Sequence, residues 1–266
     1  MITDYNNSRC STLNNSDKFV YWRQIQIIMS IIKIKDTKVK TAALVTSALY
    51  VVACTVFFTT HFTVFGHSVI PPQTVITIPV ALLAVSSLWL CPWQISLALT
   101  FCAAGDFAGA CGNLIGQMGL FAVGHIWFII YFICRYLNRV EKDRKLTGKA
   151  KGYIAMVTFC SLALLAAVFY RIVPAAEAGL LRIATGTYAC IICAMLFIAM
   201  LQRSTLFALG AILFVFSDFI IAWNMFVSAV PCSTAIIMST YYIAQWLLYI
   251  RSTSFRTGPE MRLMRF

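Results

Sequence analysis

The sequence predicts an all-helical, multi-pass membrane protein with about eight transmembrane helices. Of its 266 residues, 61% are apolar and 11% are charged, whereas a soluble domain has about 45–50% apolar and about 25% charged residues. The apolar residues form stretches near the length of about 20 residues that a helix needs to cross a bilayer. The lysines and arginines fall almost entirely in the short polar segments between and beyond these stretches. This composition excludes an ordinary soluble enzyme and a disordered scaffold.

Eight stretches are apolar enough to be predicted as spans. In chain order they cover residues 41–62, 69–90, 93–112, 116–137, 152–170, 178–201, 204–226 and 230–250. We therefore expect one membrane domain over residues 41–250, with a basic loop near 135–151. A basic N-terminal tail, residues 1–40, and a basic C-terminal tail, residues 251–266, flank this domain.

The positions of the basic residues predict the orientation in the membrane. With eight spans, 19 of the 21 lysines and arginines fall on one side, and only Arg171 and Arg182 fall on the other. Cytoplasmic loops carry such an excess, so both termini are predicted to be cytoplasmic. The net charge of +12 therefore reflects topology rather than nucleic-acid binding. We expect a protein of the cell membrane whose partners are membrane lipids, with no nucleic acid and no protein partner.

Two similar segments indicate a duplicated half. Asp106 in Ala104-Gly105-Asp106-Phe107 and Asp218 in Phe216-Ser217-Asp218-Phe219 are 112 residues apart. Each aspartate lies about two-thirds of the way through its predicted span. Two parallel four-helix halves would place both at similar depth, and membrane proteins built from repeats often have their site at the repeat interface.

Asp106 and Asp218 are the candidate catalytic residues, because only these two of the nine acidic residues lie inside apolar stretches. A charged group at the bilayer centre costs about 2.5–3.5 kcal/mol on insertion scales, and such residues are rare and usually functional. Two carboxyl groups in one water-poor site can supply one proton donor and one anion. The alternative is that protonated aspartates only tie helices together by hydrogen bonds.

Further polar residues lie in the predicted spans. His125 is expected at a depth comparable to Asp106, either as a structural residue or as a proton partner of an aspartate. The glycines of the third and fourth spans form small-x-x-x-small patterns that allow close helix packing beside Asp106. No phosphate-binding loop, hydrolase elbow or metal-spaced Cys/His cluster occurs in the sequence, so no cofactor and no metal are expected.

These residues carry a family resemblance. The first motif is Ala104-Gly105-Asp106 followed by Phe121-x-x-x-His125 and then aromatic residues as far as Tyr131, and a weaker pattern includes Tyr188. The second runs from Gly210-Ala211 through Ser217-Asp218 to Ala222-Trp223-Asn224-Met225-Phe226, and the third is Tyr241-Tyr242-Ile243-Ala244-Gln245. Over about residues 75–250 the chain resembles the lysoplasmalogenase-like membrane protein family, also called the YhhN or TMEM86 family. One departure is Ile78-Pro79, where the family often has Lys-Pro.

The resemblance implies an ether hydrolase that cleaves the vinyl ether bond of lysoplasmalogen-type lysolipids, giving a fatty aldehyde and a glycerophospho-alcohol. Asp106 and Asp218 would act as acid and anion, in an order that the sequence leaves open. The candidate supporting or substrate-binding residues are His125, Tyr131, Tyr188, Asn224, Tyr241, Tyr242 and Gln245. Two alternatives stay open: a small proton-coupled transporter that uses the same aspartates, and a non-catalytic lipid-binding protein.

Overall fold

A computed structural model describes residues 37–63, 72–142 and 148–255. These residues form eight α-helices and no strand, which confirms the predicted all-helical fold. The helices are α2 (Thr37–Thr63), α3 (Pro72–Leu90), α4 (Trp93–Ala110), α5 (Leu114–Lys142), α6 (Gly148–Arg171), α7 (Leu180–Met200), α8 (Thr205–Phe226) and α9 (Ser233–Thr253).

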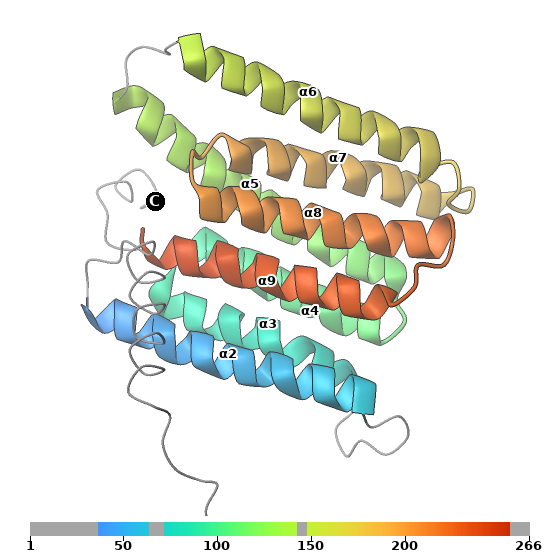
Figure 1. The fold of residues 1–266 in the computed structure, drawn as a ribbon, viewed down its shortest axis with the longest axis horizontal. Coiled ribbons are helices and arrows are strands. Elements are labelled where there is room, and N and C mark those ends of the chain that lie inside the picture. Colours follow the sequence, from blue (N-terminus) through green and yellow to red (C-terminus); the bar gives the residue numbers. More distant parts are fainter. Residues whose placement is uncertain (1–36, 64–71, 143–147, 256–266) are drawn as a thin grey trace, which may run out of the picture.

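Each helix falls on one predicted stretch, and successive helices run in alternating directions (Figure 1). Helices α2, α5, α6 and α9 extend a few residues into the segments predicted as tails and loop. Such extensions are expected, because a helix satisfies its own backbone groups where the chain leaves the apolar layer. The rest of the predicted tails, residues 1–36 and 256–266, and the middle of the basic loop, residues 143–147, lie outside the described residues.

Five helices, α2, α5, α6, α7 and α8, are long and apolar enough to cross a membrane, and α3 contains a shorter apolar stretch, Val75–Leu90. Helices α4 and α9 are not among them. Both carry buried polar side chains, among them Asp106 and Gln245, which lower their hydropathy. The chain is thus a helical membrane protein, and the number of eight spans stays a prediction.

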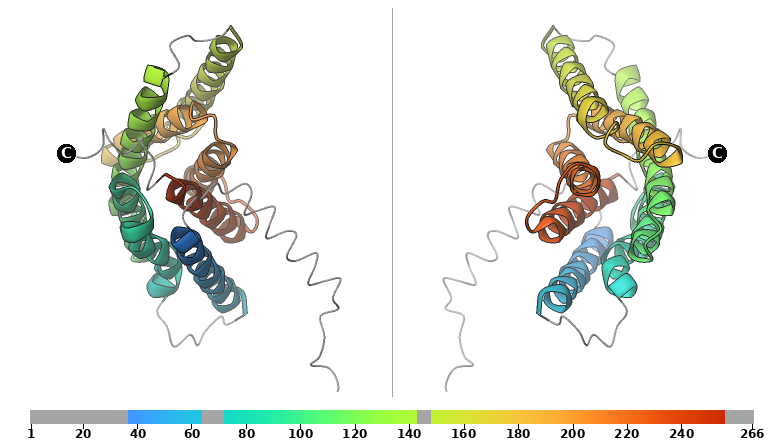
Figure 2. Two further views of the ribbon diagram at one scale, coloured as in Figure 1. Left: turned by 90° about the vertical axis from the view of Figure 1, so that its left-hand side faces the viewer. Right: turned by 90° about the vertical axis from the view of Figure 1, so that its right-hand side faces the viewer.

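The helices form two layers that enclose the core (Figure 2). Helices α3, α4 and α5 make one layer, and α2, α9 and α8 make the other. Helix α7 packs against both α5 and α8 and so joins the layers at one edge. Within the described residues, α6 comes within packing distance of α7 alone. A cavity therefore separates α6 from the two layers, and the described part of α6 makes no helix contact with them.

The two ends of the bundle differ in charge. Where α5 and α9 end, the guanidinium carbons of Arg135 and Arg251 lie 3.6 Å and 4.6 Å from the ring centroid of Phe255. At the opposite end, Arg182 donates hydrogen bonds from Nε and Nη2 to the carbonyl oxygen of Ala176, at 3.1 Å and 2.9 Å. The helix directions therefore separate these basic residues as the eight-span map requires, and the side that faces the cytoplasm stays a prediction.

Close helix crossings recur in the two halves. A Cβ atom added to Gly124 of α5 would lie 3.1 Å from the carbonyl oxygen of Ala98 on α4. One added to Gly210 of α8 would lie 3.3 Å from the carbonyl oxygen of Ala244 on α9. Ala98 and Gly210 are 112 residues apart, the same spacing as the two aspartates. Their partners do not correspond, because the position 112 residues after Gly124 is Ile236 and not Ala244, so the two crossings are not related by the repeat and the duplicated half stays a prediction.

Substitution of Gly124 by alanine is expected to lower the free energy of unfolding by about 1–3 kcal/mol. The new methyl group would meet the Cys102 sulfur at 3.0 Å and the backbone oxygen of Ala98 at 3.1 Å, and a backbone atom cannot move aside cheaply. Thermal unfolding in detergent measures the effect. Gly119 is the matched control, because it lies on the same helix and a Cβ there meets nothing within 4 Å. A Gly124→Ala protein as stable as Gly119→Ala would contradict the tight crossing.

Candidate functional site

The two aspartates lie on different helices and each accepts a hydrogen bond from a tyrosine. Asp106 of α4 is 5% exposed. The hydroxyl group of Tyr241 on α9 donates to its Oδ2 atom at 3.0 Å. A tyrosine from the second half of the chain therefore holds the aspartate of the first half.

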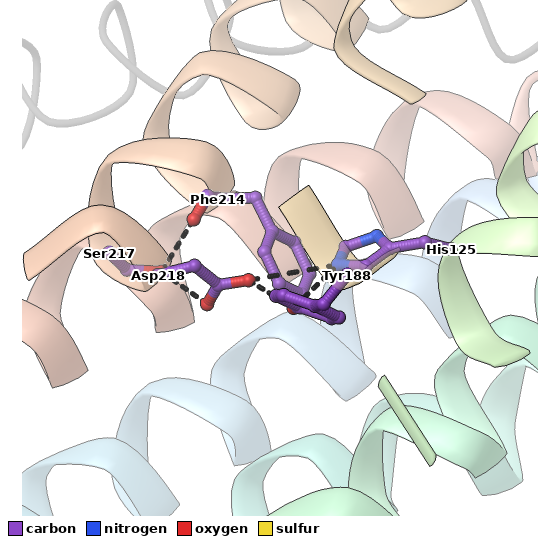
Figure 3. A network of polar contacts seen from close by, with 5 residues as sticks. All are labelled: His125, Tyr188, Phe214, Ser217 and Asp218. Carbon is purple, nitrogen blue, oxygen red and sulfur yellow. Dashed lines mark hydrogen bonds and ion pairs between the residues drawn. The ribbon is translucent and has the colours of Figure 1, made fainter. Parts of the chain in front are cut away.

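Asp218 of α8 contacts Tyr188, His125 and Ser217 (Figure 3), and the Ser217 hydroxyl lies 3.5 Å from Asp218 Oδ1 as a hydrogen-bond donor. The hydroxyl group of Tyr188 on α7 donates a short hydrogen bond to Asp218 Oδ2. The Nε2 atom of His125 on α5 lies 3.1 Å from the Tyr188 oxygen and 3.8 Å from the same Oδ2 atom. His125 is fully buried. Histidine, tyrosine and aspartate thus form one polar cluster that draws side chains from three helices.

This cluster can hold its protons in two ways. Tyr188 has one hydroxyl hydrogen, so when it donates to Asp218, the His125 Nε2 atom must donate to the tyrosine oxygen. When Asp218 carries a proton, it can donate to Tyr188, which then donates to an unprotonated Nε2. The two arrangements differ only by a shift of protons along the chain of three groups. The cluster can therefore deliver a proton at Asp218 and take it back.

Aromatic rings link the two aspartate–tyrosine pairs. The ring centroid of Phe214 lies 4.5 Å from that of His125 and 5.3 Å from that of Tyr241. Phe121 lies 5.9 Å from Tyr241 and 6.3 Å from Phe214. Phe214 thus contacts a ring from each pair, His125 beside Asp218 and Tyr241 beside Asp106. Both pairs therefore belong to one water-poor interior, where an electrostatic interaction is weakly screened.

A cavity of about 760 Å³, its open mouth included, lies between α5, α6, α7 and α8. Its lining is mostly apolar, and Asp218 is the one carboxyl group in it. Tyr188, Thr185 and Gln117 supply polar atoms beside Asp218. Asp106 and Tyr241 do not line the cavity. The two aspartates therefore differ in their access to a ligand.

Several predicted site residues lie with the aspartates. Tyr188 and His125 contact Asp218, and Tyr241 contacts Asp106. His125 contacts Asp218 rather than Asp106, since α5 packs against both α4 and α7 and the His125 ring lies beside Tyr188 of α7, whereas Asp106 of α4 is bound by Tyr241 of α9. Gln245 is fully buried on α9, one turn from Tyr241.

Three other predicted residues have different surroundings. Tyr242 donates a hydrogen bond to the carbonyl oxygen of Ile76 at 3.0 Å. Asn224 Oδ1 accepts one from the backbone N–H of Val230 at 2.9 Å and so fixes the turn after α8. Tyr131 packs its ring 6.1 Å from that of Phe207. The structure does not bring these three side chains to the cavity.

Phe121 and Phe214 are the residues that a search for reactive groups overlooks. Both are buried, and their rings contact the polar clusters; the carbonyl oxygen of Phe214 also accepts a hydrogen bond from Ser217 Oγ at 2.7 Å. Phe121 stands four residues before His125 in the first motif, but a phenylalanine ring carries no reactive group, so its identity gives no chemical signal. The spacing of the repeat gives a weak one, because Phe214 and Cys102 stand four residues before the two aspartates. Within the described residues, no group of His, Cys, Asp or Glu is suited to hold a metal ion.

The fold and site define a helical membrane protein whose buried carboxyl groups pair with tyrosines beside an apolar cavity. The chain belongs to the YhhN family, whose model matches residues 66–252. It is 29% identical over 210 residues to lysoplasmalogenase TMEM86B of Rattus norvegicus, covering 76% of this chain and 81% of the rat protein. It is 26% identical over 211 residues to the Mus musculus protein of the same name, covering 76% and 84%. A segment of 51 residues is 47% identical to lysoplasmalogenase TMEM86A of Homo sapiens, covering 19% and 21%. No solved structure matches the chain.

Proposed function

We propose that the protein is a hydrolase of the cell membrane that cleaves the vinyl ether bond of lysoplasmalogen-type lysolipids. The observation that carries the proposal is Asp218, a carboxyl group hydrogen-bonded to Tyr188 in the wall of an apolar cavity. An apolar cavity with a few polar groups suits a lipid whose reacting bond adjoins its hydrocarbon chain. The names of the mammalian relatives indicate the same activity.

The reaction needs an acid and a water molecule. A proton is added to the β-carbon of the vinyl ether, and the adjoining carbon and oxygen become an oxocarbenium ion. Water adds to that carbon and loses a proton, which gives a hemiacetal. The hemiacetal collapses to a fatty aldehyde and a glycerophospho-alcohol. General acid catalysis of this kind contributes about 10²–10⁴-fold to a rate, and a nearby anion stabilises the cation, as in glycoside hydrolysis.

The proposal gives these two tasks to the two aspartates. Asp218 is the better candidate for the proton donor, because it lines the cavity and is joined to His125 through Tyr188. Asp106 is then the candidate for the anion, and the Tyr241 hydroxyl holds it behind the aromatic rings that stand between it and Asp218. His125 and Tyr188 return a proton to Asp218 after each turnover.

Purified protein is expected to release fatty aldehyde from a lysoplasmalogen and none from the matching lysolipid with a saturated ether. The saturated ether has no β-carbon that can accept a proton, so it cannot form the oxocarbenium ion by this route. Aldehyde is measured by trapping with a hydrazine reagent and mass spectrometry. The control is a mock purification, carried out in the same way, from cells that lack the gene. Absence of aldehyde from the vinyl ether would refute the proposed function.

A further inference from the structure

The polar groups of the cavity are not spread evenly along it. Helices α5 and α7 begin, and α8 ends, at the same end of the bundle (Figure 1). At 1.5 Å per residue, Asp218 and Tyr188 lie about 12 Å along their helices from that end. Thr185 lies about 8 Å from it and Gln117 about 5 Å, by the same rise. All four polar residues therefore lie between the level of Asp218 and this end of the bundle.

The opposite end of the cavity is apolar. Ile192, Cys193 and Val215 line it, and the helix rise places them about 16–20 Å from the same bundle end, beyond Asp218. The residues of α6 that line the cavity, Leu164 and Val168, lie only about 5–11 Å from that bundle end, so α6 does not line this deeper part. Because the described residues of α6 make no close helix contact with α5 or α8, α6 does not close the sides of the cavity toward these two helices.

The amide of Gln117 and the hydroxyl of Thr185 are suited to bind a hydroxyl group. Thr185 Oγ1 donates its hydrogen to the carbonyl oxygen of Leu181 at 2.8 Å, so it can still accept a hydrogen bond. The Gln117 side chain lies against Gly109, where its amide atoms would be 2.4–2.6 Å from an added Cβ. The amide therefore packs against α4 at Gly109, at the edge of the cavity that Gln117 lines. Among the described residues, Arg171 and Arg182 are the basic residues at this end of the bundle.

We infer that the lysolipid lies in the cavity with its glycerol against Gln117 and Thr185, its vinyl ether at Asp218, and its hydrocarbon chain toward Cys193. The inference rests on the proposed function. Gln117 and Thr185 bind the free hydroxyl on the second glycerol carbon, and this contact selects lysolipids. The phosphate group then lies nearest the end that carries Arg171 and Arg182. Ile78, which stands where the family often has lysine, takes no part in this arrangement.

The experiment compares two vinyl ether substrates, a lysoplasmalogen and an analogue with hydrogen in place of the free glycerol hydroxyl. The wild-type protein is expected to prefer the lysoplasmalogen by about tenfold in kcat/KM, since a net hydrogen bond is worth about 0.5–1.5 kcal/mol. Thr185→Val and Gln117→Leu are each expected to reduce this preference to about threefold or less. Thr185→Ser keeps a hydroxyl group and is expected to show the wild-type preference for the lysoplasmalogen.

Thr158→Val is the matched control, because Thr158 of α6 also donates to a carbonyl oxygen in its own helix but does not line the cavity. It is expected to keep the wild-type preference. A wild-type protein without preference, or cavity variants with the full preference, would overturn the inference while leaving the hydrolase intact. Absence of aldehyde in the wild type would instead mean that the proposed function fails.

A second measurement tests the other end of the cavity and does not depend on the first variants. Cys193→Phe adds a ring at the apolar end, whereas Cys190→Phe adds the same ring to an exposed position of the same helix. With a long-chain lysoplasmalogen, kcat/KM is expected to fall about tenfold or more in Cys193→Phe alone. If both variants cleave the long chain as the wild type does, the chain does not lie toward Cys193 and the inference is wrong.

Discussion

Substitution of Asp218 by asparagine is expected to reduce aldehyde release about 10³-fold or more, while the protein still inserts into the membrane. Asparagine keeps the size of the side chain and can still accept the hydrogen bond from Tyr188. It cannot give a proton to carbon, and the loss of a general acid removes about 10²–10⁴-fold in rate. Aldehyde release per mole of purified protein, with lysoplasmalogen as substrate, measures the effect.

Asp218→Glu is the companion variant. It keeps a carboxyl group but displaces it by one methylene, so partial activity is expected. Size-exclusion profiles and thermal unfolding in detergent show whether either variant is misfolded. A fully active Asp218→Asn protein would contradict the mechanism in which Asp218 is the proton donor. Unchanged turnover together with lower thermal stability would instead support the alternative in which the aspartates only hold helices together.

The sequence alone predicts the helices and the two aspartates well, for physical reasons that can be stated. Apolar stretches of about 20 residues are required by the thickness of the bilayer, and α2 to α9 fall on them. A carboxyl group in such a stretch is costly enough that its presence is informative. Asp106 and Asp218 are therefore conspicuous in the sequence before anything is known of their neighbours.

The partners of the aspartates could not be predicted in the same way. The rise of a helix gives the depth of His125, but depth alone does not say which neighbouring helix the ring faces. Helix α5 lies against both α4, which carries Asp106, and α7, which carries Tyr188, and only the structure shows that the His125 ring faces Tyr188. Tyr131 and Tyr188 are both tyrosines in apolar spans, yet one packs on Phe207 and the other binds Asp218.

The cavity also could not be predicted from the sequence. Its walls are ordinary apolar residues of four helices, and such residues look the same whether they face lipid or a ligand. The asymmetry between the two halves arises here. Asp106 and Asp218 occupy equivalent positions in the sequence repeat. In the described part of the structure, however, α6 does not pack against α5 or α8, and this leaves a cavity beside Asp218.

Substitution of Asp106 by asparagine is expected to lower kcat about 100-fold and to change KM by less than about twofold. Asp106 is buried and does not line the cavity, so its loss should leave substrate binding intact. Removing a fixed group that stabilises charge in a transition state costs about 10²–10³-fold. Steady-state kinetics with lysoplasmalogen separate kcat from KM.

Tyr241→Phe is the smaller change at the same place, because it removes only the hydroxyl that donates to Asp106. It is expected to lower kcat by about tenfold and to leave the preference for the free glycerol hydroxyl unchanged. A rise in KM or a lost preference in Asp106→Asn would show that Asp106 contacts the substrate after all. Such a result would place the lipid between the two layers rather than beneath α6. The two aspartates would then share the reacting bond, as the symmetry of the repeat alone suggests.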